Sequence, residues 1–369
     1  MMFYAHTPKC HNDGATDDWH KLSDHLNGTA NLAEHFASFF ADGKGLARMA
    51  GLLHDLGKYT PAFQKKLHGA KCHAPHSAHG AKKAIESCGD LGYLLAYAIA
   101  GHHAGLANGK GYDSKRQALK RRIENCNLDE LADEWQTEIK LTDAKLMCKA
   151  LDKFKSDKDN RQFQCAFLVR MLFSCLVNAD RQDTRAYYDK SKEEPCASQP
   201  SLEDLHAKLE KHMHKFKPDT SDNKIKTIND WRNKILTSVT ANAALEQGIF
   251  SLTVPTGGGK TLTSLAFALK HAIKHNLRRV IYVIPFTNII EQTADIFRKA
   301  LGNEAILEHH SDFNLDNLRG DDPYQGKEKF KLATETWNAP IIITTAVQFF
   351  ESLFAAKTTK CCKLHNISS

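Results

Sequence analysis

The chain has 369 residues, which fits two domains better than one, and its 42% apolar and 25% charged residues exclude a disordered protein. The formal net charge of +7 permits a polyanionic partner, and ten cysteines without a CxxC pair exclude a zinc ribbon and a disulfide framework. Because the sequence shows no signal-peptide pattern and no apolar run near 18 residues, we expect a cytoplasmic protein without a membrane segment.

Residues 1–215 are predicted to form an almost wholly helical domain. Apolar residues recur at helical spacing in DHLNGTANLAEHFASFF, LARMAGLLHDLGK and GDLGYLLAYAIAGHH. The stretch RQFQCAFLVRMLFSCLVNAD is apolar nearly all round, which indicates a helix at the centre of the core. Two polar stretches, at 190–201 and 214–224, then enclose one further helix at about 202–216. We assign residues 216–230 to a linker.

After about residue 230 short β-branched runs alternate with helical patterns. The predicted strands are GIFSLTVP (248–255), RRVIYVIP (278–285) and APIIITTA (339–346), and KTLTSLAFALKHAIKH and NIIEQTADIFRKAL are the predicted helices. Alternation of this kind indicates βαβ units and a parallel sheet. Residues 231–369 therefore predict an incomplete α/β domain with three or four strands.

A candidate phosphate loop, VPTGGGKTLTS, lies between a predicted strand and a predicted helix. It departs from GxxxxGK[ST] only at the first glycine. Backbone N–H groups of Gly257, Gly258 and Gly259 can turn toward an anion, and the helix N-terminus adds donors. Lys260 would reach the β- and γ-phosphates, and Thr261 would hold Mg²⁺. No later strand ends in the acidic pair that ATP hydrolysis requires, so we expect nucleotide binding without hydrolysis.

The stretch LLHDLGK places His54 beside Asp55 at the end of an apolar helix, with Lys58 one turn on. A satisfied buried ion pair is one interpretation, and a metal site is the other. Further candidate groups lie near the ends of other apolar helices: His25, His76, His79, His102, His103 and Asp180. Imidazoles and carboxylates without thiolates suit two ions of Mn, Fe, Co, Ni or Mg, about 3.5–4 Å apart, for cleavage of a phosphodiester. Asp55 would bridge the ions, and Lys58 would stabilise developing negative charge.

The order H…HD…H…HH…D on a helical domain resembles the HD phosphohydrolase superfamily. Together with VPTGGGKT, it is similar to the CRISPR-associated helicase–nuclease of type I systems, in the variant with an N-terminal nuclease domain. Other similar stretches are YAHTP, GLLHDLGKYTPAFQKKL, PHSAHGAKKA, AGHHAGL, CLVNADRQDT, YVIPFTNIIEQ, LEHHSD and ITTAVQFFESLF. The resemblance covers most of the chain, which ends before the DEAH-type box of that family.

The resemblance implies an HD-type helical domain followed by a partial first RecA-like helicase lobe. It implies catalytic roles for Asp55 and Lys58, and metal ligands at His25, His54, Asp55, His76, His102, His103 and Asp180. It implies contacts to ATP and Mg²⁺ at Thr256, Gly257, Gly258, Gly259, Lys260 and Thr261. It also implies single-stranded DNA contacts at Thr287, Thr344, Thr345 and Gln348. We favour His76 over His79 as a ligand because His76 precedes Ser77, as in the family.

Three functions remain open from the sequence. The first is a metal-dependent nuclease for single-stranded DNA in CRISPR antiviral defence, fused to the ATP-binding part of a helicase and partnered by the CRISPR surveillance ribonucleoprotein complex. The second is an HD phosphohydrolase for small nucleotides, because the same metals cleave monoesters. The third is a truncated fragment without catalytic activity.

Overall fold

The chain forms two compact units, as seen in a computed structural model that describes residues 1–8, 16–40, 43–109, 118–124, 129–141, 159–189, 199–215, 223–311, 313 and 327–368. The first, which we call the helical unit, consists of residues 1–193 together with 351–368. The second, the sheet unit, consists of residues 194–350. The predicted fold class, a mainly α domain followed by a small parallel-sheet domain, is confirmed.

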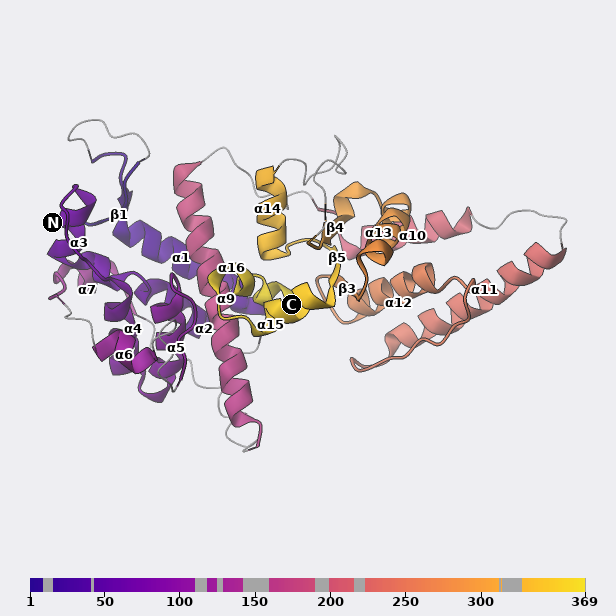
Figure 1. Cartoon of the computed structure of the whole chain (residues 1–369), viewed down its shortest axis with the longest axis horizontal. Coiled ribbons are helices and arrows are strands. Elements are labelled where there is room, and N and C mark those ends of the chain that lie inside the picture. Colours follow the sequence, from indigo (N-terminus) through magenta and orange to yellow (C-terminus); the bar gives the residue numbers. More distant parts are fainter. Residues whose placement is uncertain are drawn as a thin grey trace. The chain divides into compact units, whose positions relative to one another are not determined.

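The helical unit contains one short antiparallel strand pair and a set of packed helices (Figure 1). The strands are β1 (Tyr4–His6) and β2 (His20–Lys21). The longer helices are α1 (Leu22–Phe36), α2 (Gly43–Leu53), α4 (Ser77–Cys88), α5 (Asp90–Gly101) and α9 (Arg161–Tyr188). The shorter elements are η1 (Ala37–Phe39), η2 (Leu56–Tyr59), α3 (Pro61–Leu67), α6 (Leu119–Glu124), α7 (Glu134–Glu138), α16 (Thr358–Cys361) and α17 (Leu364–Ile367).

Helix α9 is the central helix of this unit and packs against α1, α2 and α5. Its continuous apolar surface explains this position, because a helix that is apolar all round must be surrounded by other elements. By length and composition α9 could also cross a membrane, but 61% of its most apolar window is buried inside the fold. That burial is typical of a core helix in a water-soluble domain.

Glycines allow two helix pairs to approach closely in the helical unit. A Cβ atom added at Gly51 of α2 would lie 2.5 Å from the Ala30 Cα atom of α1. A Cβ atom added at Gly80 of α4 would lie 1.7 Å from the Leu53 carbonyl oxygen of α2. Both distances are far below van der Waals contact, so only glycine fits at these positions. Gly80 thus sets the position of the C-terminus of α2, immediately before His54.

The sheet unit has a three-stranded parallel sheet in the order β3-β5-β4. Its strands are β3 (Val280–Ile284), β4 (Ile306–His309) and β5 (Ile341–Thr345). Its helical elements are α10 (Leu202–His214), α11 (Asn223–Ala241), η4 (Asn242–Ala244), α12 (Lys260–Lys274), α13 (Thr287–Leu301), η5 (Asn303–Ala305), α14 (Lys327–Thr336) and α15 (Ala346–Phe354). Apolar residues of α10, α12 and α13 and of the three strands form its core.

The strand predicted at 248–255 is not present, and a strand that was not predicted, β4, lies at one edge of the sheet. Within the described part of the chain, the segment 248–255 pairs with no strand. Ile249 is fully exposed, so it packs against no neighbouring strand, whereas Val254 at the end of the segment is buried. Strand β4 is only four residues long and ends in two polar residues, Glu308 and His309, so its sequence lacks the apolar β-branched run that predicts a strand.

The division into units also differs from the predicted boundaries at 215 and 231. Helix α10 lies in the sheet unit, because Leu202, Leu205 and Leu209 pack into that core. Residues 351–368 lie in the helical unit. Of the predicted linker, residues 216–222 fall outside the described residues, and 223–230 form the first turns of α11.

Candidate metal centre and phosphate loop

The backbone of the HDLGK stretch turns sharply and places its polar groups on one side. Helix α2 ends at Leu53, and the 3₁₀ turn η2 follows directly after Asp55. The Lys58 backbone N–H donates to the Asp55 carbonyl at 2.9 Å. The turn brings the Lys58 Nζ atom within 2.7 Å of the Asp55 Oδ2 atom. Thr60 then caps α3 and accepts a hydrogen bond from the Phe63 backbone N–H, so the next helix starts at Pro61.

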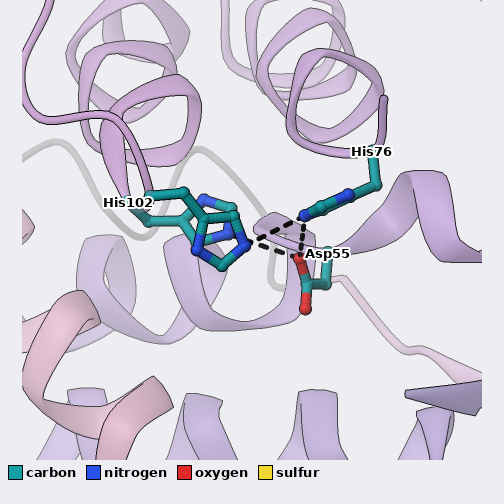
Figure 2. Close-up of side chains that lie close together, drawn as sticks. Asp55, His76 and His102 are labelled. Atoms are coloured by element: carbon teal, nitrogen blue, oxygen red, sulfur yellow. Dashed lines mark hydrogen bonds and ion pairs between the residues drawn. The ribbon is translucent and has the colours of Figure 1, made fainter. Parts of the chain in front are cut away.

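The Asp55 carboxylate lies between two groups of imidazoles. On one side, its Oδ2 atom lies 3.4 Å from His25 Nε2 and 3.3 Å from His54 Nε2. On the other side, Oδ1 lies 3.4 Å from His76 Nε2 and 3.3 Å from His102 Nε2 (Figure 2). These side chains come from α1, from the end of α2, from the residue before α4 and from the end of α5. One carboxylate thus faces both halves of the cluster.

Asp180 and His103 complete the two halves. The Asp180 Oδ1 atom lies 3.6 Å from His25 Nε2 and 3.7 Å from His54 Nε2. The His103 Nε2 atom lies 3.0 Å from His76 Nε2. The first half is therefore His25, His54, Asp55 and Asp180, and the second is Asp55, His76, His102 and His103. We call these seven residues, of which Asp55 belongs to both halves, the Asp55 cluster.

The donor atoms of the Asp55 cluster fit divalent metal ions. His54 Nδ1 donates to the Gly51 carbonyl at 2.8 Å, and His102 Nδ1 donates to the Ile99 carbonyl at 2.6 Å. Each bond leaves the Nε2 lone pair free to point at the cluster centre. The buried Nε2 atoms of His25, His54 and His102 and the Oδ1 atom of Asp55 have no hydrogen-bond partner. Buried polar atoms rarely lack partners, and four that converge on one point indicate a cation site.

The electrostatics of the cluster favour a bound cation as well. Burial raises the pKa of Asp55, but Lys58 and His54 outweigh it and hold the pKa well below its usual range. Burial lowers the pKa of His54, yet Asp55 and Asp180 together raise it to about 10. The two carboxylates thus stay ionised and require positive charge beside them, either a proton or a metal ion. Burial lowers the pKa of His76 to about 4 and that of His103 to about 3, so both rings are neutral, as metal ligands must be.

Asp183, which was not among the predicted site residues, orients the His25 ring. Its Oδ2 atom accepts a hydrogen bond from His25 Nδ1 at 2.7 Å. A carboxylate on the second ring nitrogen fixes the tautomer and raises the basicity of the ligating nitrogen. Asp183 lies three residues after Asp180 on α9, and this helical spacing was the signal that could have revealed it.

Asp183→Asn is therefore expected to weaken metal binding by about 10- to 100-fold, because an amide oxygen orients His25 less strongly than a carboxylate. Calorimetric titration of the apoprotein with Mn²⁺ measures this change. Asp24→Asn is the matched control, since Asp24 is exposed beside His25 on α1 and has no contact with the cluster. Equal affinities of Asp183→Asn and the control would contradict the role of Asp183.

The structure separates His76 from His79. Whereas His76 lies in the cluster, the His79 Nε2 atom donates a hydrogen bond to the Asp129 backbone carbonyl at 3.0 Å. A Cβ atom added at Gly57 would lie 2.6 Å from His79 Nδ1, so this ring packs against the turn after Asp55. His79 thus packs against the turn that follows Asp55 but is not a member of the Asp55 cluster. Asp180 also differs from expectation, because α9 continues to Tyr188 and Asp180 lies within the helix.

The N-terminal strand β1 contributes to the centre, which sequence periodicity did not show. The Ala5 carbonyl accepts a hydrogen bond from Lys58 Nζ at 3.2 Å. The next residue, His6, lies 3.3 Å from Thr184 Oγ1 through its Nε2 atom. Burial lowers the pKa of His6 to about 3, so this ring is neutral. Strand β1 thus holds Lys58 in place and forms part of the wall beside Asp180.

The candidate phosphate loop of the sheet unit contains two glycines in the left-handed region of backbone conformation. Gly257 and Gly259 have φ values of +85° and +82°, which favour glycine. Helix α12 begins directly at Lys260, and Lys260 and Thr256 are exposed. Arg232 of α11 donates from Nε to the Gly257 carbonyl at 2.9 Å and fixes one side of the loop.

The four residues expected to contact DNA lie at the ends of β3 and β5. Thr287 begins α13, and the Gln348 backbone N–H donates to Thr345 Oγ1 at 3.2 Å. Thr344 is fully buried and donates from its hydroxyl to the His309 carbonyl at 2.8 Å. The Thr344 side chain therefore connects β5 to β4 and is not on the surface in this structure, which differs from its expected role.

Comparison with known proteins agrees with both units. The HD domain model matches residues 22–150, and the model for the type III restriction enzyme res subunit matches residues 205–363. The CRISPR-associated nuclease/helicase Cas3 of Haloferax volcanii is 32% identical over 133 residues, which make up 31% of this chain and 14% of that protein.

Solved structures share the fold over the whole chain. The T. fusca Cas3–ATP structure has a TM-score of 0.55 at 14% identity and covers 100% of this chain. The T. fusca Cas3–ADP structure has a TM-score of 0.54 at 13% identity and covers 99%. The chain spans 46% of each of these structures, less than half of their length. The chain thus combines a region that matches the HD domain model with a later region that matches the res subunit model, and its fold resembles that of Cas3.

Proposed function

We propose that the helical unit is a metal-dependent nuclease for single-stranded DNA in CRISPR antiviral defence. The observation that carries this proposal is the position of Asp55 between two imidazole groups. His25, His54 and Asp180 would hold one ion with Asp55, and His76, His102 and His103 would hold the other. Ions of the Mn, Fe, Co or Ni type, or Mg²⁺, supply Lewis acidity at the phosphate and an activated water.

The residues of the chain itself prepare the site for a phosphodiester. Lys58 is only 4% exposed and holds the Asp55 carboxylate in its bridging orientation. Its ammonium group also lines the cavity above the cluster, where it offsets negative charge on a bound phosphate. The rings of His54 and His102 are locked by backbone carbonyls, so their Nε2 atoms need no reorientation when substrate binds.

The sheet unit is proposed to bind ATP and Mg²⁺ at Thr256 to Thr261 and to be part of a DNA helicase. The support is the left-handed backbone at Gly257 and Gly259, followed by a helix N-terminus. We also propose that Thr287, Thr345 and Gln348 contact single-stranded DNA. The proposed location is the cytoplasm, and the proposed partner is the CRISPR surveillance ribonucleoprotein complex.

Lys260→Ala is expected to weaken binding of a non-hydrolysable ATP analogue at least about tenfold, because it removes the cation that reaches the terminal phosphates. Fluorescence titration with a labelled analogue in the presence of Mg²⁺ measures the affinity. Lys270→Ala is the matched control, since Lys270 is exposed on the same helix, away from the loop. Equal binding by the two variants would contradict the assignment of the phosphate loop.

An HD phosphohydrolase for small nucleotides is the second candidate function. The cluster geometry is equally suited to monoesters, and the cavity above it, about 420 Å³, is large enough for a mononucleotide. A comparison of deoxynucleotides with a single-stranded oligonucleotide separates the two. Inorganic phosphate released from nucleotides without strand cleavage would favour the second function. Metal-dependent strand cleavage would favour the nuclease. The absence of both reactions would favour a fragment without catalytic activity.

A further inference from the structure

The cavity above the Asp55 cluster has two chemically different walls. One wall contains the cluster residues Asp55, His102 and His103 together with Lys58. A stripe of α9 also lines the cavity, with residues at helical spacing: Val177, Asp180, Arg181, Thr184 and Arg185, of which Asp180 is itself a cluster residue. The cluster wall is where a scissile phosphate would bind. The α9 stripe adds two guanidinium groups that the metal centre itself does not need.

Most polar groups of the α9 stripe already have partners. The Arg181 guanidinium donates to Thr358 Oγ1 at 3.3 Å and contacts Cys362 Sγ at 3.7 Å. The Thr184 hydroxyl lies between His6 Nε2 and Asp180 Oδ1, at 3.3 and 3.5 Å. These contacts hold both side chains in the wall of the cavity through partners within the helical unit.

Arg185 differs from these neighbours. Its side chain is half-buried and lines the cavity, yet no described residue forms a hydrogen bond or ion pair with its guanidinium group. A partner becomes more favourable for an arginine as it is buried, because removing a charge from water without compensation is unfavourable. A guanidinium group presents five N–H donors in a plane that matches two oxygens of a phosphate. The position therefore suits a ligand phosphate next to the metal centre.

We propose that Arg185 binds a phosphate that flanks the scissile one, and that this contact makes the site select polynucleotides over single phosphate esters. The inference rests on the proposed nuclease function and names a residue that determines its substrate. A polynucleotide has a second phosphate to place against α9 while the first lies at the cluster. A simple diester has only the first, so it gains nothing from Arg185.

The test uses the full chain as wild type, Arg185→Ala and Arg185→Lys, with Arg48→Ala as the matched control. Arg48 lies on α2, pairs with Asn31 and Glu34, and is not among the cavity residues. Binding of a fluorescent single-stranded oligonucleotide is measured by anisotropy over a range of salt concentrations. Cleavage of the oligonucleotide and of bis(p-nitrophenyl) phosphate, a diester without a flanking phosphate, is measured with Mn²⁺.

For Arg185→Ala we expect oligonucleotide binding to weaken about tenfold, with an intermediate loss for Arg185→Lys. The slope of log K against log salt should fall by about 0.7, the value for one lost phosphate contact on a single strand. The ratio of kcat/KM for the oligonucleotide to that for the simple diester should fall about tenfold. Arg48→Ala should stay within about twofold of wild type in each measurement.

Two results would overturn the inference. The first is unchanged oligonucleotide binding and salt slope in Arg185→Ala. The second is an equal loss of both cleavage activities, which would mean that Arg185 supports the cluster or the fold. If the wild type bound DNA but cleaved neither substrate with any metal, the nuclease proposal would fail. The binding comparison would then still decide whether Arg185 contacts a backbone phosphate.

Discussion

Asp55→Ala is expected to abolish tight binding of both metal ions and to reduce strand cleavage at least about a thousandfold. Mutation of a residue that only orients a ligand typically lowers metal affinity 10- to 100-fold. Asp55 itself faces both halves of the cluster, with Oδ2 toward His25 and His54 and Oδ1 toward His76 and His102. Its removal therefore takes a ligand from each ion at once. It also leaves Lys58, whose ammonium group is 2.7 Å away, without its partner.

Elemental analysis of dialysed protein and calorimetric titration with Mn²⁺ measure the first effect. Asp90→Ala serves as the control, because Asp90 is an exposed carboxylate in the first turn of α5. Asp55→Asn keeps the shape of the side chain, so a loss in both Asp55 variants with unchanged helical circular dichroism assigns the effect to the carboxylate. Two tightly bound ions in either Asp55 variant would show that Asp55 does not bridge them.

Gly80→Ala is expected to destabilise the helical unit by about 3 kcal/mol, at the upper end of the overpacking range. The added Cβ atom would lie 1.7 Å from the Leu53 carbonyl oxygen and 3.3 Å from the Ile99 side chain. The first contact is with backbone, so it is relieved only if α4 moves away from α2. Since His54 and Asp55 follow Leu53, and His76 precedes α4, this movement also separates the two halves of the cluster.

Urea denaturation followed by circular dichroism at 222 nm measures the destabilisation, and Mn²⁺ titration measures the change in the site. Gly109→Ala is the control, because among the described residues its added Cβ atom would meet only the Tyr97 hydroxyl, at 3.4 Å. A Gly80→Ala variant as stable as this control, with wild-type metal affinity, would mean that α2 and α4 pack with more tolerance than the structure shows.

Much of the metal centre is predictable from the sequence because its residues lie next to strongly periodic helices. His54 and Asp55 follow the apolar face of α2, and His102 follows that of α5, so their helices predict where they point. The choice between His76 and His79 is not predictable in this way. It depends on the turn around Gly57, whose N–H donates to the His76 carbonyl at 3.2 Å. That contact joins residues from two different elements.

The parts of the structure that the sequence did not predict depend on tertiary contacts. Asp183 and Arg185 lie on the polar last turns of α9, where hydrophobic periodicity does not predict which residues or cavities their side chains contact. The residues at 248–255 have the composition of a strand but form none, because a strand requires a neighbour to pair with. Residues 351–368 join the core of the helical unit through Cys361 and Cys362, which are too distant in sequence for any local pattern to indicate.

We expect the Asp55 cluster to cleave single-stranded DNA with bound metal and without help from the nucleotide site. The most direct measurement is incubation of the full chain with circular single-stranded DNA, with Mn²⁺, Co²⁺, Ni²⁺ or Mg²⁺ and without ATP, beside Asp55→Ala. A circular substrate removes any need for a strand end. We predict cleavage that requires a divalent metal and disappears in Asp55→Ala. Intact circles with every metal, from a sample with wild-type helical content, would contradict the claim.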